Sequence, residues 1–263
     1  MALKPDVIFW TAEDPSELDA LQSSTGIPVV GLNAQGEITV TDDSFAQNIR
    51  ILGKVLHEEA RATQLLDGIA SIQKELAGYA SKVSQKQKAY IGGMMYFQNG
   101  DLFNTSGNYL PFDLGGVKNC MPYNEGVPYK TDVKIIANSG AEYFFVDNAN
   151  YTTCQDEYEK NKDTLKESPA GSKNSDSDKR VFCLLSYKMY GTNWESELVN
   201  AYFIGKTING DVYDYDLTEK VNAVYALFFP GSGLTLEKVK EKQTHGFGWL
   251  DWGHSDGLLP PIR

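Results

Sequence analysis

The chain has 263 residues, of which 41% are hydrophobic and 22% are charged. This composition excludes a disordered protein, and no apolar run approaches the roughly eighteen residues that a membrane-spanning helix needs. The net charge of -11 argues against a nucleic-acid partner, because such partners are bound through clustered Lys and Arg side chains. We therefore expect a globular protein with one large domain or two smaller ones.

The first predicted elements are a strand, a helix and a second strand. Residues 7–10 form a continuous apolar run, which predicts a buried parallel strand. Asp14 offers an N-cap for a helix that Gly26 ends, and residues 27–32 predict the next strand. Because strand–helix–strand units normally form right-handed crossovers, we expect the two strands to lie parallel.

The next feature is a long helical connector at residues 43–84, which contain no proline. Its apolar side chains recur every three or four residues, as one buried helix face requires. These side chains are Phe45, Ile49, Leu52, Val55, Leu56, Leu65, Ile69, Ile72 and Leu76. A charged break near His57 divides the connector into two packed helices. Since a stiff helix then joins two strand-bearing regions, the connector predicts a ligand cleft between two lobes.

Strand and helix patterns alternate again in the second half of the chain. We expect strands at residues 89–97, 142–146 and 181–186, and helices at 108–114, 132–139, 156–165, 195–208, 217–228 and 236–242. Asn108 is the expected cap of the first of these helices. Residues 168–179 are rich in Ser, Asp and Lys and predict a solvated surface loop. A tail that bears glycine and tryptophan follows the last helix.

Three cysteines, Cys120, Cys154 and Cys183, lie far apart and lack the paired spacing of a zinc site. In an oxidising compartment Cys120 and Cys154 could form a disulfide, while Cys183 would be buried in a strand. No charged and apolar signal segment precedes the first predicted strand, so export would require a targeting segment upstream of Met1.

Candidate ligand contacts follow from the position of the strands. In parallel α/β folds, ligands meet the loops at the carboxyl ends of strands. This rule nominates Trp10, Tyr96, Asn104, Asn108, Tyr109, Asn148, Tyr151, Tyr187, Tyr190 and Trp194, with Thr11 and Asn150 beside them. Tyr and Trp rings offer stacking faces for an organic chelate, and Asn offers both a donor and an acceptor. The alternative is that Tyr187 and Trp194 are ordinary packing aromatics and that the Asn residues form turns.

A metal-dependent hydrolase is an alternative function from another class. His245 and His254, with Asp251 between them, could hold a metal, although their spacing matches no standard ligand pattern. The chain has no G-x-S-x-G elbow, no G-x-G-x-x-G turn and no P-loop lysine. We therefore expect a binding protein without a cofactor rather than an enzyme.

The order of these segments resembles a known family. The similar segments read KPDVIFW, GIPVVGL and FAQNIRILGKVLHEEARATQLL, then SGNYLPFDLGGVKN, AEYFFVD and KRVFCLLSYKMYGTNWESELVNAYFIGK. They look like the class III (cluster A) substrate-binding proteins of ABC importers for siderophore-chelated iron, haem and cobalamin. The resemblance runs from about Lys4 to Lys240, and the order and spacing of the segments carry more weight than any one of them.

The resemblance implies an α/β fold of two lobes joined by a long connector helix, with the start of the first lobe truncated. The implied domains are residues 1–42 as a remnant of the N-terminal lobe, 43–86 as the connector, 87–242 as the C-terminal lobe and 243–263 as a tail. A further alternative is then a surface interaction module with an incomplete cleft.

The resemblance also implies how such a protein would act. It would bind siderophore-iron, haem or a corrinoid in the interlobe cleft without covalent chemistry, and deliver this ligand to an ABC importer permease. Exposed acidic residues such as Glu125 or Asp132 would meet the permease. The expected location is extracytoplasmic, with a lipid anchor that this sequence does not contain.

Overall fold

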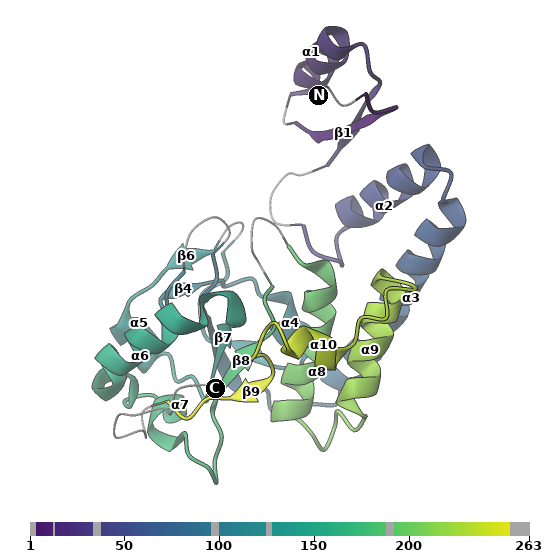
Figure 1. The fold of residues 1–263 in the computed structure, drawn as a ribbon. Helices are drawn as coiled ribbons and strands as arrows, with labels where there is room; N and C mark the ends of the chain where they lie inside the picture. Colours follow the sequence, from purple (N-terminus) through teal and green to yellow (C-terminus); the bar gives the residue numbers. More distant parts are fainter. Residues whose placement is uncertain are drawn as a thin grey trace. The chain divides into compact units, whose positions relative to one another are not determined.

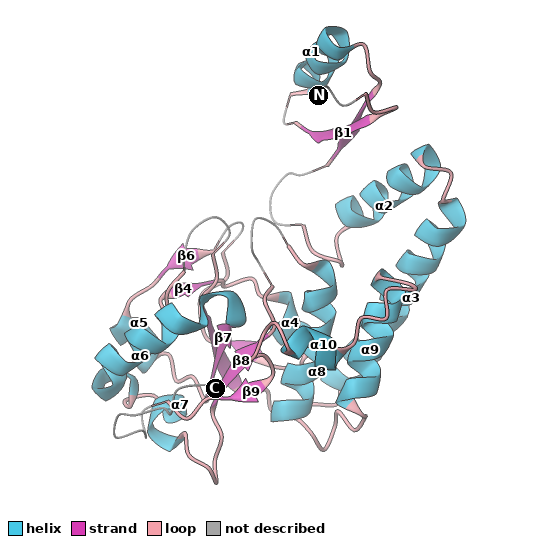
Figure 2. Cartoon of the chain, viewed as in Figure 1, coloured by secondary structure: helices cyan, strands magenta, loops and turns pink. Residues whose placement is uncertain are grey.

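The structure is a computed structural model that describes residues 4–12, 14–33, 38–95, 100–124, 128–187 and 192–252 (Figures 1 and 2). Its contacts divide the chain into two compact units, Met1–Ala70 and Ser71–Arg263. Among the described residues, no helix combines the length and the apolar character that crossing a membrane requires.

The first unit, unit 1, begins with a small parallel sheet. Its elements are β1 (Ile8–Thr11), α1 (Pro15–Thr25), β2 (Val29–Leu32), α2 (Asp43–Val55) and the first part of α3 (Glu59–Ala80). β1 pairs parallel with β2, as expected. Asp14 Oδ1 accepts a hydrogen bond from the Ser16 backbone N–H at 2.9 Å, and Gly26 ends α1 in the left-handed conformation. The expected burial of β1 is wrong, because Trp10 is 52% exposed and none of the described residues of α1 is buried.

The connector is divided into two helices as expected. α2 ends at Val55 and α3 begins at Glu59, with His57 between them at a φ of 57°. The two helices approach closely at Gly53, where an added Cβ would lie only 2.6 Å from the Cβ of Ala62. A glycine at this position therefore permits the tight packing of α2 on α3.

The second unit, unit 2, is built around a five-stranded sheet with the order β5-β3-β7-β8-β9. Its strands are β3 (Lys88–Gly92), β5 (Lys118–Asn119), β7 (Tyr143–Asp147), β8 (Val181–Leu184) and β9 (Gly248–Trp249), and β4 (Asn104–Thr105) pairs separately with β6 (Tyr129–Lys130). β5, β3, β7 and β8 run parallel, whereas β9 pairs antiparallel with β8. The main part of the sheet thus has the parallel order expected of an α/β fold.

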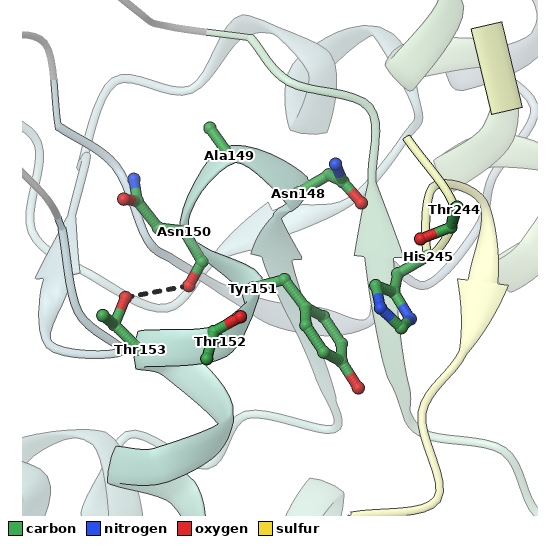
Figure 3. Close-up of a pocket in the computed structure, with 8 residues that line it drawn as sticks. All are labelled: Asn148, Ala149, Asn150, Tyr151, Thr152, Thr153, Thr244 and His245. Atoms are coloured by element: carbon green, nitrogen blue, oxygen red, sulfur yellow. Dashed lines mark hydrogen bonds between the residues drawn. The ribbon is translucent and has the colours of Figure 1, made fainter. Parts of the chain in front are cut away.

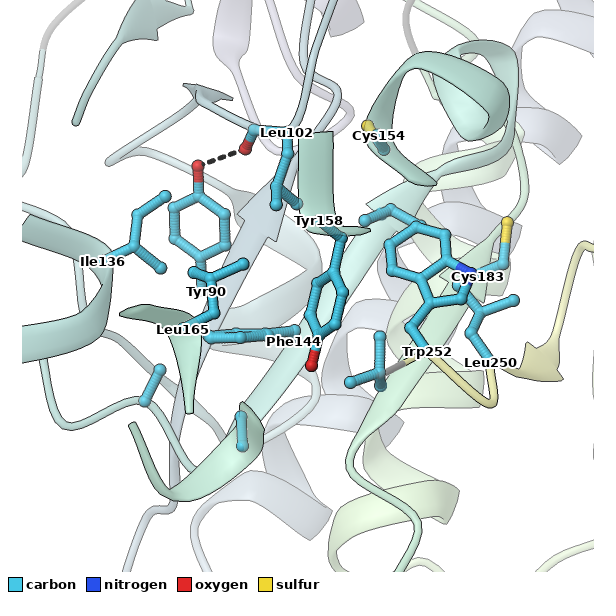
Figure 4. Packing of buried hydrophobic residues seen from close by; sticks show 14 of the residues in the cluster. Tyr90, Leu102, Ile136, Phe144, Cys154, Tyr158, Leu165, Cys183, Leu250 and Trp252 are labelled. Carbon is cyan, nitrogen blue, oxygen red and sulfur yellow. Dashed lines mark hydrogen bonds between the residues drawn. The ribbon is translucent and has the colours of Figure 1, made fainter. Parts of the chain in front are cut away.

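Helices cover both faces of this sheet. They are α4 (Leu110–Leu114), α5 (Val133–Asn138), α6 (Tyr151–Leu165), α7 (Pro169–Lys173), α8 (Trp194–Ile208), α9 (Leu217–Phe228) and α10 (Leu236–Lys240). One buried cluster joins Tyr90 and Phe144 of the sheet to α5, α6 and α7 (Figure 4). The other joins Ile91 and Phe145 to α4 and α8. Neighbouring residues of β3 and β7 thus point to opposite faces, as a pleated strand requires.

The loop expected at residues 168–179 contains a helix and buried side chains, so that expectation is wrong. Ser168 is fully buried, and its hydroxyl donates to the Leu165 carbonyl at 2.7 Å and accepts from the Gly171 N–H at 3.2 Å. Asn174 is fully buried as well. Short polar side chains can be buried when they bond to the backbone in this way, which polarity alone does not reveal.

The start of α4 also differs from expectation. Tyr109, not Asn108, is its N-cap residue, and the Asn108 carbonyl accepts a hydrogen bond from the Ser106 hydroxyl at 2.9 Å. Pro111 at the start of the helix has no N–H that needs a capping acceptor. The helix therefore begins without an Asn cap.

Residues 243–252, expected to be part of a tail, belong to the sheet and core of unit 2. Trp249 pairs with Phe182 across β9 and β8, and Leu250 and Trp252 are 5% and 3% exposed. The sequence shows no regular pattern there because β9 has only two residues. Of the expected tail, residues 253–263 lie outside the described part of the chain.

The cysteines do not form the disulfide considered from the sequence. Cys120, Cys154 and Cys183 are all within the described residues and are free thiols. Cys154 and Cys183 are buried, and burial raises the pKa of the Cys120 thiol to about 11. All three thiols are therefore protonated and weakly nucleophilic at neutral pH.

Candidate functional site

The parallel strands β3, β7 and β8 end at the same edge of the unit 2 sheet. The segments that follow β3 and β7 are joined by Asn150, whose Nδ2 donates to the Gly93 carbonyl at 2.7 Å. Its Oδ1 accepts from the Gly100 N–H at 2.9 Å. Gly93 has a φ of 78°, a conformation that a side chain would strain. The buried Asn150 amide therefore links Gly93 and Gly100 to the start of α6.

Asp147, the last residue of β7, joins the same edge to the segment after β8. It is 2% exposed, and its Oδ1 accepts from the Ala149 N–H at 2.8 Å. Its Oδ2 accepts from the Tyr187 backbone N–H, also at 2.8 Å. Two backbone donors thus stabilise the carboxylate in its buried position.

A pocket of about 290 Å³ opens beside this edge, at the start of α6 (Figure 3). Its lining residues are Asn148, Ala149, Asn150, Tyr151, Thr152, Thr153, Thr244 and His245. Among the described residues that line it, the polar groups are amides, hydroxyls and one imidazole, with no carboxylate, ammonium or guanidinium. The pocket therefore offers hydrogen bonds and aromatic surface rather than fixed charge.

The aromatic surface comes from two segments that are distant in the sequence. The rings of Tyr151 and His245 stack with centroids 3.6 Å apart and planes 4° from parallel (Figure 3). The Tyr151 ring also contacts Trp252, with ring centroids 5.6 Å apart and planes tilted by 51°. Desolvation lowers the pKa of His245 below 6.5, so its imidazole is neutral at pH 7. The pocket wall thus combines a flat, stacked pair with a neutral nitrogen base.

The chain is similar to known proteins. A family model described as "Periplasmic binding protein" matches residues 1–174, more than half of the chain. The chain belongs to the periplasmic binding protein family. Such proteins are the solute-binding components of ABC transporters, and they bind small molecules outside the cytoplasm. No curated protein sequence matches significantly.

Solved structures agree with this assignment. A solute-binding protein from Veillonella parvula is 20% identical with a TM-score of 0.68, and the match covers 90% of this chain and 69% of that one. An ABC transporter solute-binding protein from Sulfurospirillum deleyianum is 19% identical with a TM-score of 0.63, covering 90% and 72%. The molybdate-binding protein MolA from Haemophilus influenzae is 21% identical with a TM-score of 0.62, covering 88% and 74%. These likenesses confirm the expected class III fold.

Three of the residues expected at the site of this periplasmic binding protein, Asn148, Asn150 and Tyr151, lie together in the pocket. Tyr109 and Tyr187 instead pack edge to face inside unit 2, with ring centroids 5.4 Å apart. The Tyr187 hydroxyl donates to the buried Glu197 carboxylate at 2.6 Å. Burial raises the pKa of Tyr109 well above its usual value. Neither of these two rings faces solvent.

The remaining expected contacts of the binding protein are spread over other places. Asn104 is buried, and its Oδ1 accepts from the Asp101 N–H at 2.9 Å. Asn108 lies before α4, outside the pocket lining. Trp194 begins α8 and is 36% exposed, and Trp10 belongs to unit 1. Tyr96 and Tyr190 lie outside the described residues.

Sequence reasoning missed the threonines of the pocket and the role of His245 beside Tyr151. Thr152 and Thr153 were missed because α6 begins earlier than expected, at Tyr151 instead of Asp156. The pair Asn148 and Asn150 directly after a strand was the available signal for that start. His245 had no such signal, since its place depends on the pairing of β9 with β8.

The metal site of the hydrolase alternative is not formed by the described residues of the binding protein. Within them, no three His, Cys, Asp or Glu side chains lie close enough to share a metal ion. His245 stacks on Tyr151 and Asp251 is exposed, while His254 lies outside the described part. The family to which the chain belongs transports solutes and is not a family of enzymes.

Proposed function

We propose that this periplasmic binding protein binds an organic metal chelate and delivers it to the permease of an ABC importer. The ligand class is siderophore-bound iron, haem or a corrinoid, and no covalent chemistry is involved. The observation that carries this proposal is the pocket at the carboxyl edge of the unit 2 sheet, where Tyr151 and His245 form a stacked pair.

The chemistry of the pocket suits a chelate whose charge is largely balanced within the ligand itself. Its aromatic pair can contact a planar catecholate, porphyrin or corrin, because such rings stack favourably on aromatic side chains. The Asn148 amide and the threonine hydroxyls can bond to the oxygen atoms at the periphery of a ligand. A neutral His245 can accept a hydrogen bond or coordinate a borderline metal.

The size of the pocket indicates how much of the ligand it contacts. A volume of about 290 Å³ is near the lower end of the roughly 300–1,000 Å³ typical of small-molecule sites. It suits one ring or arm of a chelate, with the rest of the ligand extending beyond the pocket.

The ligands of proteins with the same fold support the proposal of a metal-containing ligand. The MolA structure from Haemophilus influenzae is described as bound to molybdate, and the Helicobacter pylori CeuE structure, with a TM-score of 0.58 at 15% identity, as having Ni(II) bound. Because these two ligands differ, the shared fold is consistent with a metal-containing ligand but does not identify the chelator. Experiment must identify it.

Delivery to a permease and a lipid anchor are further parts of the proposal. Of the two acidic residues expected at the permease, Asp132 caps α5, its Oδ1 accepting from the Lys134 N–H at 2.8 Å. Glu125 lies outside the described residues. A carboxylate has four lone-pair sites, so capping leaves Asp132 able to accept from an arginine.

Titration of the purified protein tests the ligand class. Ferric siderophore, haem and cobalamin are added separately, and intrinsic fluorescence and calorimetry report binding. We expect one of them to bind, and Tyr151→Leu to weaken it about tenfold, which corresponds to ~1.4 kcal/mol. Tyr123→Leu is the matched control, because Tyr123 is 68% exposed and does not line the pocket.

Two results would oppose the proposal. A folded protein that binds none of the three ligands would favour the interaction-module alternative. Equal losses in Tyr151→Leu and Tyr123→Leu would show that the ligand binds elsewhere.

A further inference from the structure

Residues 243–252, here the C-terminal segment, form one wall of the pocket. The segment contributes Thr244 and His245 to the lining and carries Trp252 in the core (Figures 3 and 4). The Tyr151 ring therefore contacts the segment twice, at His245 and at Trp252. Any displacement of the segment along β8 would alter both contacts.

The pairing of the segment with β8 is short. β9 matches only Trp249 with Phe182 and Gly248 with Cys183. Two backbone hydrogen bonds extend this pairing, from the Phe247 N–H to the Cys183 carbonyl and from the Leu250 N–H to the Val181 carbonyl, both at 2.8 Å. Because backbone hydrogen bonds can form in any register, side-chain interactions select the alignment.

Asn174, immediately after α7, supplies such an interaction. Its Oδ1 accepts from the Trp249 Nε1–H at 2.7 Å, and from the Arg180 and Val181 N–H groups at 2.9 and 3.2 Å. Its Nδ2 donates to the Leu250 carbonyl at 2.8 Å and to the Trp252 carbonyl at 3.3 Å. One fully buried amide thus bonds to the start of β8 and to three residues of the segment.

We propose that Asn174 is a positioning residue for the pocket, which sets the register of the C-terminal segment on β8 and so holds His245 and Trp252 against Tyr151. This inference rests on the pocket of the proposed function. The Asn174 amide can bond to both β8 and the C-terminal segment because it presents an acceptor oxygen and an NH₂ donor in one plane. An apolar side chain there would leave two carbonyls and the Trp249 Nε1–H without these partners.

Nuclear magnetic resonance of the histidine side chains tests this role without any ligand. The chain has three histidines, and His245→Gln identifies the signals of that residue. In the native protein we expect its ring protons to be shifted upfield by the stacked Tyr151 ring. We also expect a titration midpoint below 6.5, because burial lowers the pKa of His245.

Asn174→Ala should remove the upfield shift and move the titration midpoint of His245 toward 6.5. Asn209→Ala is the matched control, since the Asn209 amide donates to the Gly115 carbonyl at 3.1 Å, away from the segment. It should destabilise the protein and leave the His245 signals unchanged. A change of the His245 signals in Asn174→Ala but not in Asn209→Ala would distinguish a positioning role of Asn174 from a general loss of stability.

Trp249→Phe provides a milder variant should Asn174→Ala not fold. It keeps an aromatic ring at this position but removes the Nε1–H bond to Asn174, and it should shift the His245 signals in the same direction by a smaller amount. A folded Asn174→Ala protein with native His245 signals would overturn the inference, as would a folded Trp249→Phe protein with no shift. The outcome is independent of the proposed function: displaced His245 signals support positioning even in a protein that binds none of the three chelates.

Discussion

Glu75 and Lys220 form a salt bridge of 2.6 Å that ties the C-terminal part of α3 to α9 within unit 2. The same carboxylate accepts from the Tyr202 hydroxyl of α8 at 2.8 Å. Tyr79, one turn further along α3, packs on the Tyr213 and Tyr215 rings at centroid distances of 5.1 and 5.6 Å. A polar and aromatic contact therefore fastens this part of the connector to the helices of unit 2.

Removing the charge of Glu75 should weaken this attachment. Glu75→Gln keeps a side-chain oxygen for Tyr202 but loses the ion pair, whose side chains are about 30% exposed and therefore screened by solvent. We expect the free energy of unfolding, from urea denaturation, to fall by about 1 kcal/mol. Lys160→Met is the control, because its partner Glu157 lies in an exposed pair on α6. Equal effects of the two changes would refute a special role for Glu75.

Buried tyrosines should make the protein lose stability in alkaline solution. Burial raises the pKa of Tyr90, Tyr158, Tyr202 and Tyr225 above 10.0, so these hydroxyls stay protonated in the folded state. The unfolded chain releases these protons near pH 10. The contribution of the buried tyrosines to the free energy of unfolding is therefore intact below pH 10 and is lost as the pH rises further. Each buried tyrosine then lowers the free energy of unfolding by up to about 1.4 kcal/mol per pH unit.

Urea denaturation at pH 8, 10 and 11 would measure this loss. Tyr225→Phe should reduce the steepness of the decline above pH 10, whereas Tyr123→Phe, at an exposed position, should not. A free energy of unfolding that stays constant from pH 8 to pH 11 would contradict the expectation.

His245 should make the pocket sensitive to mild acid. Its pKa is lowered in the folded state by desolvation, so the unfolded chain binds the proton more readily. The neutral imidazole therefore contributes fully to the free energy of unfolding above pH 6.5. This contribution is lost as the pH falls through the folded-state pKa. We expect chelate affinity to weaken between pH 7 and pH 5 in the native protein. In His245→Gln the pH profile should be flatter, and an unchanged profile would count against this assignment.

Gly93 should not tolerate a side chain. Its φ is 78°, and an added Cβ would lie 3.0 Å from the Cys154 sulfur. Gly93→Ala should therefore lower the free energy of unfolding by at least about 1 kcal/mol. Gly78→Ala is the opposite control, because that helical site has open space around it. It should stabilise the protein by about 0.5–1 kcal/mol, since Ala is the better helix former. Thermal or urea unfolding of both variants measures the contrast.

Much of the fold could be predicted because local sequence patterns, such as the spacing of apolar residues, determine where many helices and strands begin and end. α9 begins at Leu217 and ends at Phe228 as its spacing predicts, and the break at His57 is where charged residues interrupt the connector. The helix expected at residues 195–208 forms as α8, but all its residues from Ser196 to Gly205 are buried, which its local spacing does not predict. Contacts from several elements, including α4 and α9, decide that burial, and periodicity within one helix cannot reveal them.

The candidate site was only partly predictable for a related reason. Asn148 and Tyr151 follow a strand directly, so the rule that ligands meet strand ends found them. The same rule nominated Tyr187, whose ring turns inward because its hydroxyl bonds to Glu197. Which way a loop side chain turns depends on buried partners from elsewhere in the chain, and these are not visible in local sequence.

The pairing of β9 with β8 also has a consequence for how the protein is made. A nascent chain that has reached β8 already contains the parallel strands of the unit 2 sheet, and domains begin to fold during synthesis. The contact between Tyr151 and His245, however, joins segments far apart in sequence, and such contacts form slowly. The pocket wall beside Tyr151 would therefore form only once the residues through Trp252 have joined the sheet and core of unit 2.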